Sequence, residues 1–171
     1  MVITYSINYN SIKDILKLVK VSVDAAIFED REEIGFGIVA RDSEGALIEA
    51  KAVVHTELTD PGLAEAMGVK EALSWIEQMK WPSVILQSDF LSVVQAIRSN
   101  APMRSRYGII ILECRNIMRR LNNVELLFVK RSANMVAHQI ARESYLLSGR
   151  RLNRWSVPIS VKECIEKDLL S

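Results

Sequence analysis

The chain contains 171 residues, 49% of them apolar and 25% charged, which is typical of one globular domain with a sizeable core. Lysine and arginine (22) nearly balance aspartate and glutamate (21), so the formal net charge of +1 excludes a polybasic coat protein. The sequence contains neither a long apolar run for a membrane helix nor the pattern of a secretory signal. We therefore expect an intracellular protein, in the nucleus or the cytoplasm, with no membrane partner.

Charge is distributed unevenly along the chain. Residues 98–154 carry twelve lysines and arginines but only three glutamates, whereas the rest of the chain is net acidic. This separation predicts a surface for a polyanion beside a region that uses carboxylates. The alternative is a set of solvated helix faces, because single cations on amphipathic helices are ordinary.

The first part of the chain predicts three strands joined as an antiparallel meander. Residues 20–26 alternate apolar and polar side chains, which places Asp24 inside a strand, on the face opposite two valines. The second and third strands are expected over residues 34–41 and 46–56.

Helices and strands alternate in the rest of the chain. Asp60 and Pro61 are typical of a helix start, and the apolar spacing continues to Met79. The next strand, residues 84–88, should pair in parallel with the first strand, because a helix separates it from the meander. The remaining expected elements are helices over 90–99 and 107–121, a strand over 124–130, and a helix over 134–147 that Asn134 caps. The predicted order is β-β-β-α-β-α-α-β-α, an α/β fold.

Two ends lie outside this pattern. We expect an N-terminal arm or short helix (residues 1–19), a main domain (residues 20–147) and a C-terminal extension (residues 148–171). The final stretch, Val161 to Leu170, predicts a short helix that covers part of the core.

Three acidic residues occupy unusual positions: Asp24 inside a strand, Glu65 on the apolar face of a helix, and Asp89 at a strand end. If each acid is considered alone, the simplest explanation is that Glu65 pairs with an arginine or with the positive end of its helix, and that Asp89 caps the next helix. Taken together, they converge, because the first and fourth strands are expected neighbours and the helix packs over the sheet. Crowded carboxylates in a low dielectric need a cation between them, and a hard ion such as Mg²⁺ suits oxygen ligands.

Five segments of the chain match the motifs of a known family in order and spacing. They are Val21–Asp24, Gly35–Gly45, Ala64–Leu73, Leu86–Asp89 and Ala133–Ala141. Together they resemble the ribonuclease H domain, most closely its plant reverse-transcriptase-like branch, and the resemblance covers Lys20 to Leu147. Each segment alone is weakly specific, whereas the five together are specific.

The resemblance implies a mixed five-stranded sheet with helices packed on it. It also implies an endonuclease that hydrolyses the RNA strand of RNA/DNA hybrids and leaves a 5′-phosphate. Asp24, Glu65 and Asp89 fill three catalytic positions and would hold two Mg²⁺ ions, or Mn²⁺, on either side of the scissile phosphate.

The fourth catalytic position falls on His138, where the family has an acid, and imidazole is a poor ligand for Mg²⁺. His138 either hydrogen-bonds the loop around Arg131 or transfers protons and aids product release near the metal. Phe90 and Ala25 also depart from the family pattern, which has serine after the third acid and glycine after the first.

Basic residues are expected to hold phosphates with little base specificity. The candidates are Arg104, Arg106, Arg119, Arg120 and Arg131. The competing function is a catalytically weak or inactive ribonuclease H-like module that binds nucleic acid or protein. The third candidate function is a structural role, with dimerisation through the terminal segments. The sequence is compatible with a protein partner or a homodimer.

Overall fold

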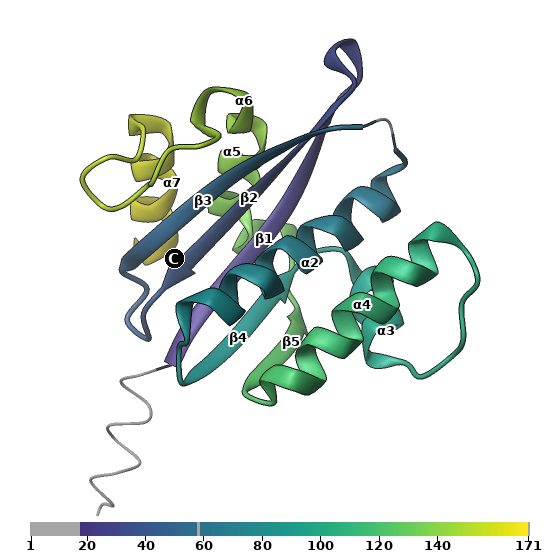
Figure 1. Cartoon of the computed structure of the whole chain (residues 1–171). Coiled ribbons are helices and arrows are strands. Elements are labelled where there is room, and N and C mark those ends of the chain that lie inside the picture. The colour runs from purple at the N-terminus through teal and green to yellow at the C-terminus, as the bar shows by residue number, and fades with distance from the viewer. Residues whose placement is uncertain (1–17, 58, 171) are drawn as a thin grey trace, which may run out of the picture.

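A mixed sheet forms the centre of the fold in a computed structural model of the chain, which describes residues 18–57 and 59–170. These residues form a five-stranded sheet of order β3-β2-β1-β4-β5 with helices on both faces (Figure 1). The elements are β1 (Leu18–Phe28), η1 (Glu29–Arg31), β2 (Glu33–Arg41), β3 (Leu47–Thr56), α2 (Pro61–Met79), β4 (Ser83–Ser88), α3 (Leu91–Arg98), α4 (Arg106–Leu121), β5 (Val124–Phe128), η2 (Arg131–Ala133), α5 (Met135–Arg142), α6 (Ser144–Leu147) and α7 (Ile159–Leu170). Within these ranges no helix is both long and apolar enough to cross a membrane.

The strand pairing agrees with the sequence expectation. β1, β2 and β3 pair antiparallel, whereas β4 pairs in parallel with both β1 and β5. The last pair between β1 and β4 joins Val23 to Ser88, so β1 continues to Phe28 with no β4 residue beside it. This leaves an open edge along the second half of β1.

Two apolar layers cover the two faces of the sheet. Val21 and Val23 are fully buried with residues of α2, α3 and α4, while Val39 on the other face packs with residues of α5 and α7. α2 begins as expected, because the Asp60 side chain accepts a hydrogen bond from the Leu63 N–H and Pro61 takes the first helical position.

Ion pairs align α2 and α4 in the same direction. Lys70 of α2 pairs with Glu113 of α4 at 2.6 Å, and Glu77 pairs with Arg120 at 3.1 Å about two turns farther along both helices. Glu57, in the segment before α2, pairs with Arg106 at the start of α4. The N-termini of α2 and α4 therefore lie at the same end of the molecule.

Helix α5 lies very close to β2 because glycine occupies the contact. Gly37 is the cross-strand partner of Asp24, and a Cβ at Gly37 would collide with backbone atoms of Ala137 and Ala141. The missing side chain lets the α5 backbone rest on the sheet beside Asp24. This close approach brings residues of α5 to the carboxylate of Asp24.

The structure differs from the sequence expectation at several boundaries. Residues 1–17 of the expected arm lie outside the described residues, and Leu18 and Val19 already belong to β1. The helix expected over 134–147 divides at Glu143 into α5 and α6. Asn134 is the N-cap residue of α5, as expected, but its side chain makes no cap hydrogen bond to that helix.

The C-terminal extension packs onto the sheet layers. Leu152 forms a β-bridge with Ala50 of β3, and Val161 of α7 is buried with the α5 residues. Arg41 of β2 pairs with Asp168 of α7 at 2.9 Å. The helix expected near the C-terminus is present as α7.

Replacement of Gly37 by alanine is predicted to destabilise the fold by about 2 kcal/mol or more, because backbone atoms cannot yield to the new Cβ as a side chain can. Gly68→Ala is the matched control, since its Cβ would meet the Phe36 ring at 3.1 Å and the helix gains propensity. Urea unfolding of both variants measures the difference. Wild-type stability for Gly37→Ala would contradict the close-approach argument.

Candidate metal and nucleic-acid site

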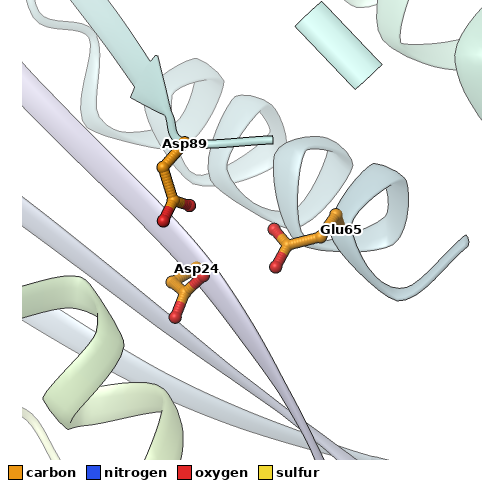
Figure 2. A group of neighbouring side chains, drawn as sticks. All are labelled: Asp24, Glu65 and Asp89. Carbon is orange, nitrogen blue, oxygen red and sulfur yellow. The ribbon is translucent and has the colours of Figure 1, made fainter. Parts of the chain in front are cut away.

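Three carboxylates from different elements meet at the open edge of β1. Asp24 lies within β1, Glu65 in the second turn of α2, and Asp89 directly after β4. One oxygen of each lies within 4.8 Å of the others. Figure 2 shows the three side chains pointing toward one another, and we call them the carboxylate cluster.

The end of β4 explains how side chains from two faces of the sheet can meet. Asp24 belongs to the α5 face and Glu65 comes from α2 on the other face, but no β4 residue pairs with β1 beyond Val23. Glu65 therefore reaches the edge of β1, where its Oε1 accepts a hydrogen bond from the Ala25 N–H at 3.3 Å. Asp89 enters the same space as the chain leaves β4.

Burial raises the pKa of two members of the carboxylate cluster. Glu65 is 6% exposed, and burial raises its pKa to about 9, with repulsion from Asp24 and Asp89 adding to the shift. Burial also raises the pKa of Asp24, and Asp89 adds to it, although His138 and Arg131 act in the opposite direction. Both carboxyl groups would be stabilised as anions by a nearby cation.

Arg131 lies across the carboxylate cluster. Its Nη1 is 3.0 Å from Oδ2 of Asp89 and 3.5 Å from Oδ1 of Asp24. Burial disfavours the charged guanidinium, but attraction to Asp24 and Asp89 outweighs it and raises the Arg131 pKa. The arginine expected to hold a phosphate is thus also a counter-ion of the carboxylates.

His138 contacts both Arg131, as one of the two expectations for it requires, and Asp24. Its Nδ1 lies 2.8 Å from Nη2 of Arg131 and 2.7 Å from Oδ2 of Asp24. One ring nitrogen therefore faces a donor and an acceptor, and it can satisfy only one of them in a given tautomer. The ring joins the loop around Arg131 to the buried Asp24.

Asn134 is a site residue that the sequence interpretation missed. Its Nδ2 donates to the Val23 carbonyl oxygen at 2.9 Å and to Oδ1 of Asp89 at 3.1 Å. Asp89 in turn does not cap α3, whose N-cap is Phe90. The sequence signal that could have identified Asn134 is its place in the segment Ala133–Ala141, which also contains His138.

The oxygens of the carboxylate cluster suit a hard divalent cation. Oδ1 of Asp24 and Oε2 of Glu65 are buried and have no hydrogen-bond partner among residues 18–57 and 59–170. Buried oxygens without a donor are costly, and several carboxylates at one point are the ligand set that Mg²⁺ or Mn²⁺ prefers. The residues present therefore fit such an ion.

The other candidate arginines lie outside the carboxylate cluster. Arg104 and Arg106 are exposed at the N-terminal end of α4, the end shared with the start of α2. Arg119 and Arg120 lie in the last turn of α4, about 20 Å farther along the helix axis. Arg106 and Arg120 are engaged by Glu57 and Glu77.

Comparison with known proteins gives a family and a set of similar folds. A family model described as reverse transcriptase-like matches residues 22–144. Ribonuclease H1 from the halophilic archaeon Halobacterium salinarum has a TM-score of 0.67 at 16% identity, with 75% of this chain and 97% of that chain covered. A comparison with curated protein sequences gave no match.

Two further structures are complexes. LC11-RNase H1 in complex with an RNA/DNA hybrid has a TM-score of 0.65 at 16% identity, covering 76% of this chain and 99% of that chain. The foamy viral protease-reverse transcriptase in complex with double-stranded DNA has a TM-score of 0.59 at 14% identity, covering 74% and 92%. Identities this low establish the fold, while the family match spans most of the chain. The chain belongs to the reverse transcriptase-like family and has the ribonuclease H fold.

Proposed function

We propose that the protein is a divalent-metal-dependent endonuclease that hydrolyses the RNA strand of RNA/DNA hybrids. The observation that carries this proposal is the meeting of Asp24, Glu65 and Asp89 within 4.8 Å, with buried oxygens that lack donors in the described part of the chain. We expect Mg²⁺, with Mn²⁺ as a substitute, and two ions in the presence of substrate. Bound ions would activate water and stabilise the leaving 3′-oxygen.

The chain's own residues would hold the ligand oxygens in place. The Ala25 N–H fixes Oε1 of Glu65 and the Asn134 amide fixes Oδ1 of Asp89, which leaves Oε2 of Glu65 without a donor among the described residues and Oδ2 of Asp89 facing Arg131. His138 contacts Asp24, and its side chain is 20% exposed, so the ring can carry a proton between solvent and the carboxylate cluster.

The basic residues support a nucleic-acid substrate. Arg131 reaches the carboxylate cluster, and Arg104 and Arg106 are exposed at the end of α4 that lies nearest the start of α2. A duplex held along α4 would also meet Arg119 and Arg120, about 20 Å away. The hybrid described with LC11-RNase H1 is the substrate class that we propose for this chain.

A catalytically weak or inactive nucleic-acid-binding or protein-interaction module is the second candidate. One observation favours it: His138 occupies the fourth position of the site, and its Nδ1 is engaged by both Arg131 and Asp24. Imidazole is a poor ligand for Mg²⁺, so the three carboxylates would have to suffice. Activity on a hybrid separates the two candidates.

Asp24→Asn is predicted to lower cleavage of a labelled RNA/DNA hybrid by at least about 100-fold in Mg²⁺, because it removes a ligand charge with little change in volume. The fold should persist, as checked by circular dichroism. Asp30→Asn, at a carboxylate that is 81% exposed, is the matched control and should retain activity. Wild-type cleavage by pure Asp24→Asn protein would show that the site is wrongly assigned.

Glu65→Gln is predicted to stabilise the protein in chelator by about 2 kcal/mol at pH 8 but little at pH 5. The pKa of the Glu65 carboxyl is about 9 in the folded protein and 4.5 for a free group, because burial, Asp24 and Asp89 oppose its negative charge. Arg131 also faces the carboxylate cluster and attracts Glu65. The protonated Glu65 carboxyl therefore contributes fully to the stability of the wild type below pH 4.5, and this contribution declines as the pH rises toward 9.

Urea unfolding at both pH values measures this difference, with Glu77→Gln on the same helix as the control. Added Mg²⁺ should stabilise the wild type more than Glu65→Gln, because the variant lacks one ligand charge. A stability gain that is equal at pH 5 and pH 8 would contradict the raised pKa.

Arg104→Ala is predicted to weaken hybrid binding at every length and to lower the salt dependence by about one counterion. The double variant of Arg119 and Arg120 to alanine should weaken only hybrids longer than about six base pairs, since that length spans 20 Å. Titrations in Ca²⁺ at several salt concentrations test both, with Arg154→Ala as the control. Salt slopes identical to wild type in all variants would exclude phosphate contacts by these arginines.

A further inference from the structure

The Arg131 guanidinium lies against two of the carboxylate oxygens that a bound cation would use. Its Nη1 contacts Oδ2 of Asp89 at 3.0 Å and approaches Oδ1 of Asp24 at 3.5 Å. Oδ1 of Asp24 is one of the buried oxygens with no hydrogen-bond donor in the described ranges. A divalent ion that uses this oxygen must therefore share it with Arg131 or displace the side chain.

Sharing is unfavourable for electrostatic reasons. A divalent ion between Asp24 and Asp89 would lie within a few ångströms of the guanidinium charge, in a site where water screens poorly. Both cations would also compete for the same lone pairs. Displacement is the alternative, and it costs the ion pairs that Arg131 now makes.

The surroundings of Arg131 allow its side chain to leave while the backbone stays. The Asn134 amide anchors the following residues to Val23 and Asp89, which holds the start of α5 against the sheet. The Arg131 side chain itself is 56% exposed. It also forms one wall of a cavity of about 280 Å³, whose lining includes Glu65 and Phe90.

We infer that Arg131 is a built-in competitor of the catalytic cation: it neutralises Asp24 and Asp89 until a divalent ion takes their oxygens and releases the guanidinium. This inference rests on the proposed metal-dependent function. A phosphate of the bound strand would then offer the released guanidinium a new anionic partner, because guanidinium pairs well with both carboxylate and phosphate. Arg131 thereby sets the ion concentration at which the carboxylate cluster loads.

The test compares two neighbouring substitutions in the absence of nucleic acid. Arg131→Gln removes the competing charge and keeps a shorter polar side chain, and Lys130→Gln removes the same charge from the adjacent exposed residue. Calorimetric titration with Mn²⁺ gives the affinity of each protein, and thermal unfolding in chelator and in Mn²⁺ gives an independent measure.

We expect Arg131→Gln to bind Mn²⁺ about tenfold more tightly than the wild type, and Lys130→Gln to bind within about twofold of it. In chelator, Arg131→Gln should unfold at a lower temperature than the wild type, because its carboxylates have lost their counter-ion. Saturating Mn²⁺ should remove that deficit.

Each other outcome has a definite meaning. Equal or weaker Mn²⁺ binding by Arg131→Gln overturns the inference, and the proposed function stands if the wild type still cleaves a hybrid. The same gain in Lys130→Gln also overturns it, because the effect would then be general electrostatics. Failure of both wild type and Arg131→Gln to bind Mn²⁺ overturns this inference together with the metal-dependent function.

Discussion

The close placement of three carboxyl groups in a largely buried position is the constraint on which the rest of the site depends. Asp24, Glu65 and Asp89 lie within 4.8 Å of one another, and burial, with a smaller contribution from the neighbouring carboxylates, raises the pKa of Asp24 and of Glu65. The protein can hold them together by retaining a proton, as the raised pKa of Glu65 indicates, or by supplying a positive charge, as Arg131 does. A bound divalent ion would provide a third solution. The burial of these groups costs folding stability, and a bound cation would recover part of that cost.

The geometry of the carboxylate cluster follows from two local features of the sheet. β4 is shorter than β1, so an edge opens beside Asp24 where side chains from both faces can meet. Gly37 lacks a side chain opposite Asp24, so α5 approaches closely enough for His138 and Asn134 to take part. The site is therefore formed at a boundary between layers. It cannot form until both helical layers are packed on the sheet.

Much of this arrangement could be predicted from the sequence, because it depends on periodicity. Alternation in β1 and helical spacing around Glu65 were enough to anticipate the convergence of the three acids. Arg131 and Asn134 were harder, since the direction of a loop side chain has no periodic signal. Asparagine before a helix also has the same sequence pattern whether it caps the helix or, as here, binds across the sheet. The pairing of Arg120 with Glu77 depends on how α2 and α4 align, which only the packed structure defines.

The β-bridge of the C-terminal extension bears on self-association. β3 is the outermost strand on its side of the sheet, and its Ala50 N–H donates to the Leu152 carbonyl oxygen at 2.7 Å. Unpaired strand edges are templates for pairing with another chain. A chain shortened before residue 148 would present this donor together with the apolar surface of Leu47 and Ala52, both of which the extension helps to bury. The extension therefore covers part of the β3 edge, and we expect its removal to favour self-association through that edge.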